Sequence, residues 1–297
     1  MYLQKLKNYI YPASLLGLFR KIQANHGELF IVGGAVRDIL LGRKPVEYDL
    51  CTNLLPEQIK PLFMIKNEQG AKFGVLQVLF HRKAFEISTY RKESSYLDFR
   101  HPKKIKFIKQ IRQDLQRRDF TINAFAYNPL DKTFIDEFSG LSDLKAKLIR
   151  TIGKPVQRFN EDALRVIRAI RIASQLNFDI EPATYNAINK TLLAKAQLPS
   201  QRFQEEITKI ILSVNPEKGF NYLNDKNLLT TLFPGPSKII GNLTSEGLNK
   251  TPRTLVRRLE FLFRKIPPKE TERILLELQY SNKKIINRII SCYNKPS

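Results

Sequence analysis

The sequence has few cysteines and no long hydrophobic run. Cys51 and Cys292 lie near opposite ends of the 297-residue chain. They lack the clustered spacing of a zinc site or a disulfide framework, which favours a reducing compartment. No apolar run approaches the roughly 20 residues of a transmembrane helix, and polar residues interrupt the N-terminal stretch where a signal peptide needs an apolar core. We therefore expect a cytoplasmic protein with no membrane partner.

Common phosphate-binding motifs and an evident nucleophile are also missing. Neither GxxxxGK[ST] nor GxGxxG occurs in the chain. His26, His81 and His101 have no evident serine or cysteine partner, so each is more typical of a surface residue than of a catalyst. Any phosphate chemistry must therefore use another arrangement.

Acidic residues are scarce relative to basic ones. Lys+Arg number 50 against 28 Asp+Glu, which gives a formal net charge of +22. Such an excess favours a polyanionic partner, nucleic acid before membrane, because binding of phosphates releases counterions. The alternative is a lysine-rich proteome that spreads positive charge over every surface. The hydrophobic fraction of 42% and the chain length predict a globular protein of two or more domains.

The first half of the chain alternates helix and strand patterns. Apolar spacing predicts a helix from about Pro12 to Asn25, followed by an apolar strand. Charged and turn residues from Arg91 to Lys104 predict a mobile loop. The expected strands are Leu29 to Val32, Val46 to Thr52, Gly74 to Phe80, Lys83 to Tyr90 and a short one near Ile105 to Ile108, and His81 and Arg82 form the turn of a hairpin.

Beyond Asp136 the pattern becomes helical. Helical spacing recurs over residues 142–149, 161–176, 182–194, 200–212, 216–224, 251–265 and 270–293. The sequence therefore predicts an α/β domain followed by an all-helical region.

The stretch from Leu29 to Asn53 carries the first candidate site. Its apolar strand leads into Gly33 and Gly34, and backbone N–H groups at such a turn can hold anionic oxygens. Glu47 and Asp49 follow at alternate positions of the next expected strand, where both would face one side and could share divalent cations. Glu86 is a plausible third carboxylate on the later strand. The alternative for an acid-x-acid pair is a solvated strand face.

Two further segments could hold a nucleotide. In QRRDFTIN, Arg118 could bind a triphosphate while Asp119 caps a helix that begins at Phe120 or Thr121. In EDALRVIRAIRIA, Asp162 lies three residues before Arg165 and could meet it on one helix face, where the pair could hydrogen-bond a base edge. Each segment also has a purely structural interpretation, as a capped helix with surface arginines and as a surface helix with ion pairs.

Taken together, these segments resemble the class II tRNA nucleotidyltransferase (CCA-adding) and bacterial poly(A) polymerase family, within the DNA polymerase β-like nucleotidyltransferases. The matching stretches are IVGGAVRDILLGRKPVEYDLCTN, GAKFGVLQV, FEISTYR, DLQRRDFTINAFAYNP, LIRTIGKPVQRFNEDALRVIRAIRIASQLNFDIEPAT and QRFQEEITKIIL. They occur in a fixed order over most of residues 29 to 212.

The resemblance implies an α+β fold, with a polymerase β-like head that contains a mixed sheet, followed by an all-helical neck and body. The head would span residues 1–145 and carry catalysis, the neck 146–215 and select nucleotides, and the body 216–297 and bind tRNA with a shortened tail. Catalysis would use Glu47, Asp49 and Glu86, with Mg²⁺ held by Glu47 and Asp49. The nucleotide-binding residues would be Gly33, Gly34, Arg37, Arg118, Asp119, Asp162, Arg165, Arg168 and Arg171.

The implied activity is addition of CMP and AMP from CTP and ATP to the 3′ end of tRNA, without a nucleic-acid template and with release of pyrophosphate. One position departs from the family pattern, which has Asp-x-Asp where this chain has Glu47. The longer side chain shifts the carboxylate by roughly a bond length, which affects metal preference or rate. The full-length segment Arg91 to Lys104 favours CCA addition or A addition over CC addition, and GAKFGVLQV is closer to the tRNA-type enzymes than to poly(A) polymerases. The alternatives are an A-adding enzyme, a poly(A) polymerase and a non-catalytic RNA-binding homologue.

Overall fold

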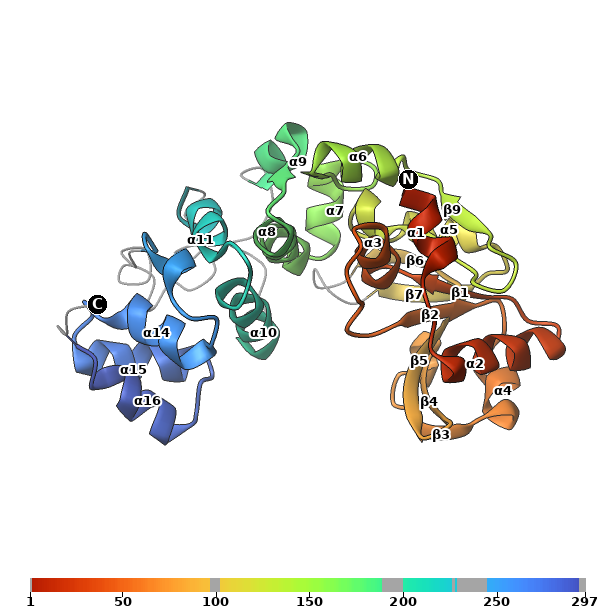
Figure 1. Ribbon diagram of the computed structural model, residues 1–297, viewed down its shortest axis with the longest axis horizontal. Helices are drawn as coiled ribbons and strands as arrows, with labels where there is room; N and C mark the ends of the chain where they lie inside the picture. The colour runs from red at the N-terminus through yellow and green to blue at the C-terminus, as the bar shows by residue number, and fades with distance from the viewer. Residues whose placement is uncertain (1, 97–101, 189–199, 226–227, 229–244, 294–297) are drawn as a thin grey trace. The chain divides into compact units, whose positions relative to one another are not determined.

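The chain folds into two compact units in a computed structural model that describes residues 2–96, 102–188, 200–225, 228 and 245–293 (Figure 1). The N-terminal unit comprises Met1–Leu97, His101–Ala146 and Arg150–Ile152. The C-terminal unit comprises Lys147–Ile149 and Gly153–Ser297. The limits given above for head, neck and body remain predictions.

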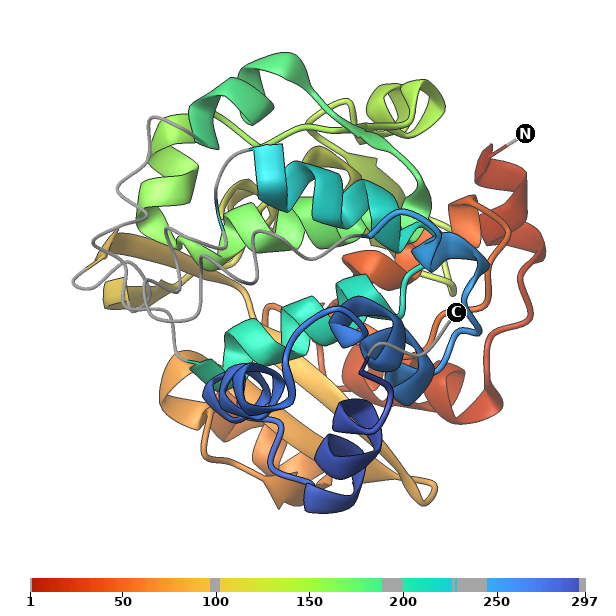
Figure 2. The same cartoon turned by 90° about the vertical axis from the view of Figure 1, so that its left-hand side faces the viewer.

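A seven-stranded mixed sheet forms the centre of the N-terminal unit. Its strand order is β3-β4-β5-β2-β1-β8-β9, and Figure 2 shows strands β3 to β5 in orange and tan from a second side. Among these pairs β2 and β5 run parallel, while the other pairs are antiparallel. This sheet confirms the α+β class with a mixed sheet. The strands are β1 (Leu29–Val32), β2 (Asp49–Thr52), β3 (Met64–Asn67), β4 (Val75–Phe80), β5 (Lys83–Thr89), β8 (Phe125–Tyr127) and β9 (Phe134–Asp136).

The predicted hairpin between β4 and β5 is confirmed. His81 and Arg82 form its two-residue turn and both have a positive φ, of 48° and 60°. Two left-handed residues in succession match the right-handed twist of the flanking strands. The register of the hairpin, with Phe80 opposite Lys83, therefore places Glu86 opposite Gln77.

The strand predicted from Val46 to Thr52 is shorter than expected. It begins only at Asp49, because Asp49 pairs with Val32, the last residue of β1, and the chain leaves the sheet at Gly33. Val46 and Glu47 therefore precede the strand, and Val46 is fully exposed. The expectation that Glu47 and Asp49 alternate on one strand was wrong.

The expected mobile loop was also wrong for its described residues. Strands β6 (Arg91–Tyr96) and β7 (Pro102–Phe107) pair as an antiparallel ribbon, with Arg91 opposite Phe107. Residues 97–101 lie outside the described part of the chain.

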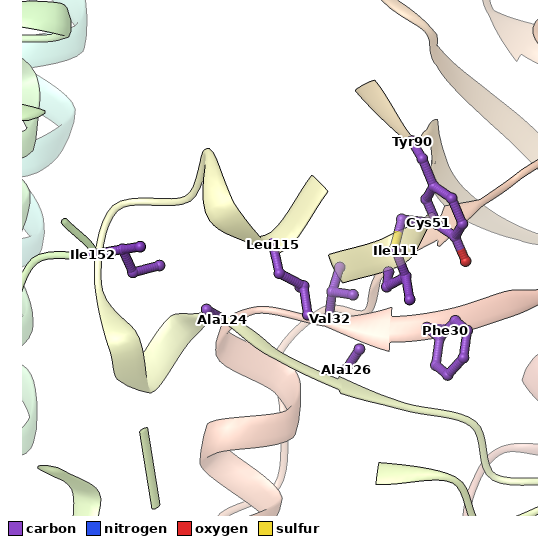
Figure 3. Close-up of a cluster of buried hydrophobic side chains, with 9 residues drawn as sticks. All are labelled: Phe30, Val32, Cys51, Tyr90, Ile111, Leu115, Ala124, Ala126 and Ile152. Carbon is purple, nitrogen blue, oxygen red and sulfur yellow. The ribbon is translucent and has the colours of Figure 1, made fainter. Parts of the chain in front are cut away.

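A buried cluster beneath the sheet anchors the helix before the QRRD segment. Figure 3 shows Ile111 and Leu115 of α5 (Ile111–Gln116) together with Val32 and Cys51 of the sheet. Leu115 and Cys51 are fully buried. Burial of one such side chain stabilises the fold by about 1.5–3 kcal/mol, so α5 is held firmly against β1 and β2. The backbone that carries Arg117 and Arg118, directly after α5, is thereby held in place.

Short helices complete the N-terminal unit. The helix expected after Asp119 is only a single 3₁₀ turn, because the chain enters β8 two residues after it ends. Phe120, not Asp119, is its N-cap residue. The Asp119 carboxylate instead accepts hydrogen bonds from the Phe120 N–H and the Asn123 amide. The helices are α1 (Tyr2–Asn8), α2 (Ala13–Ala24), α3 (Gly34–Leu40), α4 (Pro56–Ile59), η1 (Lys60–Leu62), η2 (Ala71–Phe73), α5, η3 (Thr121–Asn123) and α6 (Gly140–Ala146).

The C-terminal unit is mostly helical, and its helix α8 packs against α10 and α11 (Figure 1). The segment Glu161 to Leu176 is not one helix, because the backbone is extended at Asp162 (φ −147°) between α7 and α8. The segment 270–293 likewise forms two helices. The helices are α7 (Pro155–Glu161), α8 (Leu164–Leu176), α9 (Pro182–Ala187), α10 (Ser200–Ile211), α11 (Pro216–Asp225), η6 (Leu248–Lys250), α14 (Leu255–Phe263), α15 (Pro268–Glu277) and α16 (Lys283–Ile290).

The C-terminal unit is not entirely helical. Strands β10 (Leu148–Ile149) and β11 (Asp179–Ile180) form a two-stranded parallel sheet, so the prediction of an all-helical neck was incomplete. Two-residue strands leave no periodic pattern in a sequence, which explains why this sheet was missed. No helix in the described ranges is long and apolar enough to cross a membrane.

Candidate active site

Two carboxylates of the N-terminal unit lie on neighbouring parallel strands. The register pairs Asp49 of β2 with Glu86 of β5. Paired residues on adjacent strands project to the same face and have neighbouring side chains. The structure therefore brings Asp49 and Glu86 together, as expected, although they are 37 positions apart in the chain.

Electrostatics show that these acids influence one another. The pKa of Glu86 is raised by partial desolvation and by the negative charges of Asp49 and Glu47. The pKa of Asp49 is also raised by desolvation and by Glu47, while Arg118 lowers it. Glu47 is thus close enough to act on both carboxylates although it precedes the strand. Like charges held together in this way are typical of functional sites.

A cavity of about 440 Å³ opens beside the three carboxylates. This volume lies within the usual range for small-molecule sites. Its lining includes Glu47, Asp49 and Glu86, together with residues from α2, β4 and the start of β5. The sequence did not predict that the N-terminal helix α2 contributes to this cavity.

Gly33 separates Asp49 from Arg118. It has φ +70°, and a Cβ there would lie 3.4 Å from both an Asp49 carboxylate oxygen and an Arg118 guanidinium nitrogen. Only glycine adopts this backbone without strain, and its missing side chain leaves space between the anion and the cation. The glycine turn, the carboxylate and the arginine therefore meet at one place, as the sequence predicted.

Asp114 positions the arginines, and sequence reasoning missed it. Its carboxylate is fully buried and accepts hydrogen bonds from Arg117 Nε at 2.9 Å, Arg118 at 3.3 Å and the Arg91 N–H at 3.1 Å. These contacts lower the pKa of Asp114 despite its burial. The signal was present, because Asp114 precedes Arg117 and Arg118 by three and four residues on a helix. The Arg118 Nε is buried and has no hydrogen-bond partner in the described structure.

Arg37 and Asp119 are joined through Asn123. Arg37 donates to the Asn123 side chain at 2.7 Å and to Asp38 at 2.9 Å, and Asn123 donates to Asp119 at 3.3 Å. Gly34 begins α3, and a Cβ there would lie 3.3 Å from the Arg37 guanidinium. These residues form one network below the glycine turn. Their role toward a nucleotide stays a prediction.

The donor set at the cavity fits a magnesium ion. In the described ranges no three Asp, Glu, His or Cys side chains are close enough together to enclose a metal. Mg²⁺ is usually held by only one or two carboxylates, and waters and substrate phosphates complete its shell. Oxygen donors from Glu47 and Asp49 meet that requirement. The pKa of Asp49 is raised by desolvation and by the charge of Glu47, and a bound cation would offset both effects.

The remaining candidate residues lie in the C-terminal unit. Arg165 is only 5% exposed and donates to Glu161 at 2.6 Å and to the Arg158 carbonyl at 2.9 Å. Asp162 accepts from the Leu164 N–H and lies 3.7 Å from Arg168. The expected pairing of Asp162 with Arg165 on one helix face was therefore wrong, because Asp162 lies outside the helix.

Arg171 links two helices of the same unit. Its Nε donates to Glu206 of α10 at 2.6 Å, and another guanidinium nitrogen donates to Gln175 at 2.8 Å. Glu206 is itself buried. Arg171 thus packs α8 onto α10, and nucleotide contacts by Arg165, Arg168 and Arg171 stay predictions.

Comparisons with known proteins place the chain among nucleotidyltransferase relatives. The poly(A) polymerase head domain matches residues 29–150, and the probable RNA and SrmB-binding site of polymerase A matches residues 177–239. The CCA-adding enzyme of Pediococcus pentosaceus is 36% identical over 91% of this chain and 69% of its own length. That of Ligilactobacillus salivarius is 41% identical over 72% of this chain and 52% of its own length.

A solved structure shows the same architecture. The Bacillus stearothermophilus CCA-adding enzyme in complex with CTP superposes with a TM-score of 0.72 at 27% identity, over 95% of this chain and 67% of that one. The chain matches about half to two thirds of the length of these relatives. From its motifs, its fold and these matches, the chain belongs to the family of CCA-adding enzymes and bacterial poly(A) polymerases.

Proposed function

We propose that the chain is a Mg²⁺-dependent, template-independent nucleotidyltransferase. It adds CMP and AMP from CTP and ATP to the 3′ end of tRNA and releases pyrophosphate. The observation that carries this proposal is the placement of Asp49 beside Glu86 on parallel strands, next to the Gly33 turn and Arg118. The relatives named CCA-adding enzymes, and one solved with CTP, support the choice of tRNA and nucleotides.

The chemistry follows from the charges around the cavity. The 3′ oxygen of the RNA forms a bond to the α-phosphorus, the bond between the α- and β-phosphates breaks, and pyrophosphate leaves. Glu86 accepts the hydroxyl proton, for which its raised pKa suits it. Arg118 is held by Asp114 and offers the guanidinium nitrogen beside the Gly33 turn to the triphosphate.

A metal ion would complete this site. When bound by Glu47 and Asp49, Mg²⁺ would supply positive charge to the reacting phosphate and to the attacking oxygen. The rest of the positioning comes from the protein, because β2, β5 and the Gly33 turn are fixed by the sheet.

The positive charge of the chain suits a polyanionic RNA. The formal net charge of +22 favours binding of a phosphate backbone and predicts strong weakening by salt. In the C-terminal unit, Asp162 and Arg165 would select the base by its Watson–Crick edge. Arg165→Ala would then erode the preference for CTP and ATP over UTP and GTP more than it weakens triphosphate binding.

The assay that tests the proposal uses three RNA ends. Purified protein is incubated with tRNA ending before CCA, after C, and after CC, with CTP and ATP supplied separately. The proposal expects CMP on the first two ends and AMP on the third, each with release of pyrophosphate. AMP on the third end alone would make the chain an A-adding enzyme, and long AMP tracts on all three would make it a poly(A) polymerase.

Glu47, which stands where the family pattern has Asp, is the residue that argues most strongly against catalysis. Binding of tRNA with no incorporation under any divalent ion, and no further change in Asp49→Ala, would identify a non-catalytic RNA-binding homologue. Incorporation that needs Mg²⁺ and disappears in Asp49→Ala supports the enzyme.

A further inference from the structure

A row of three polar side chains crosses the cavity wall. Asp49 of β2 pairs with Glu86 of β5, and Glu86 pairs on its other side with Gln77 of β4. All three face the same side of the sheet and line the cavity. The proposed reaction uses the first two residues and leaves Gln77 without a role.

Two neutral polar groups in this cavity have unused hydrogen-bonding capacity. In the described structure the Gln77 amide makes no hydrogen bond. The Ser14 hydroxyl, in the first turn of α2, is buried and has no partner. A buried hydroxyl without a partner costs about 1–3 kcal/mol, which a ligand would recover. Both groups can donate and accept.

The charge of the cavity limits what can bind there. Glu47, Asp49 and Glu86 are acidic, and Lys83 is the one cation among the lining residues. Without metal, the three carboxylates would repel an anionic phosphate at this wall, whereas they do not repel a neutral hydroxyl group. A hydroxyl is also the complement of an amide and a serine, since it donates once and accepts twice.

From this arrangement we infer that Gln77 and Ser14 contact the 2′-hydroxyl of the terminal ribose of the acceptor RNA. The inference rests on the proposed function, because the 3′-hydroxyl of that ribose is placed at Asp49 and Glu86. The 2′-hydroxyl is on the neighbouring carbon and so faces the next position of the row. Gln77 and Ser14 therefore make the site specific for an RNA end and against a DNA end.

The test compares two acceptors that differ in one oxygen. A tRNA lacking CCA is prepared with either ribose or 2′-deoxyribose at its last nucleotide, and kcat/KM for CMP addition is measured on both. We expect wild type to prefer the ribose end by about tenfold, the worth of one to two neutral hydrogen bonds. In Gln77→Leu and in Ser14→Ala the ratio should fall toward one through loss of activity on the ribose end alone.

A matched control and a binding measurement complete the test. Gln69→Leu makes the same chemical change at an exposed position between β3 and η2 and should keep the wild-type ratio. Ser14→Ala removes one atom, so it tests the inference if Gln77→Leu is poorly folded. The Kd of each acceptor without nucleotide gives the same ratio and needs no turnover.

Different results would overturn the inference about Gln77 and Ser14 and the proposed function. A wild-type ratio near one, or equal losses on both acceptors in the variants, overturns the inference about Gln77 and Ser14. Failure of wild type to add nucleotides to the ribose end overturns the proposed function, while the Kd ratio still decides the inference.

Discussion

Charged side chains are arranged differently in the two units. In the N-terminal unit the sheet places Asp49 beside Glu86, and Arg118 keeps a buried nitrogen without a partner. In the C-terminal unit Arg165 and Arg171 already donate to Glu161 and Glu206. Uncompensated charge costs stability and is retained where a ligand compensates it, whereas paired charge supports the fold. Substitutions in the first unit should therefore act mainly on activity, whereas substitutions of the paired arginines in the second unit should also lower stability.

The largest effect that separates the units is expected at Arg118. Arg118→Ala removes the guanidinium between Gly33 and Asp114, so kcat/KM for the nucleotide should fall by about a thousandfold. Tm should fall only modestly, because Arg117 and the Arg91 N–H still donate to Asp114. Steady-state incorporation assays and thermal denaturation measure the two quantities. Arg112→Ala is the control, because Arg112 is exposed and pairs with Glu137. Equal losses in both variants would remove the special role of Arg118.

A second contrast concerns the buried arginine of the C-terminal unit. Arg165→Ala removes a nearly buried guanidinium from Glu161 and from the Arg158 carbonyl, while Arg158 still bonds Glu161 at 2.8 Å. The free energy of unfolding should therefore fall by about 2 kcal/mol. Chemical denaturation measures this change. Arg273→Ala breaks an exposed pair with Glu270 and should cost less than about 1 kcal/mol. If both variants are equally stable, the pairing of Arg165 does not support the fold and the comparison between units fails.

The smallest effect concerns the pH dependence of stability. The pKa of Glu86 is raised in the folded protein, so its ionised form is disfavoured there. The penalty is absent below the ordinary glutamate pKa, grows as the pH rises through the raised value, and is complete above it. Glu86→Gln should therefore raise Tm by about 1 °C near neutral pH, a small gain because solvent screens the partly buried group.

The pH profile gives this prediction its control. At about pH 4 wild type and Glu86→Gln should melt together, because the carboxyl is then mostly protonated in both states. A stabilisation that is the same at low and neutral pH would come from packing and would contradict the electrostatic account of the site.

Strong local patterns were predictable from the sequence, while details set by distant pairing were not. The hairpin at His81 and Arg82 followed from periodicity and turn residues, whereas the α+β class with a mixed sheet was implied by the resemblance. The start of β2 at Asp49 depends on where β1 ends, which no local pattern of Val46 to Thr52 contains.

The candidate site shows the same division. The proximity of Asp49 and Glu86 was expected from their strands, and Arg118 and Arg165 were candidates from their own segments, while the resemblance added the nucleotide role of Arg37. The burial of Asp114 and the approach of Ser14 from α2 depend on tertiary packing, so sequence reasoning missed both. Asp162 left its expected helix because the chain breaks between α7 and α8.

Incorporation of labelled CMP into tRNA lacking CCA, by wild type and Asp49→Asn with Mg²⁺, tests the catalytic role of the paired carboxylates most directly. Asp49→Asn keeps the size of the side chain and removes the charge that faces Glu86 and Arg118. We predict a loss of at least about a thousandfold in kcat/KM, with no change for the exposed control Glu57→Gln. Incorporation by Asp49→Asn within about tenfold of wild type would contradict the account.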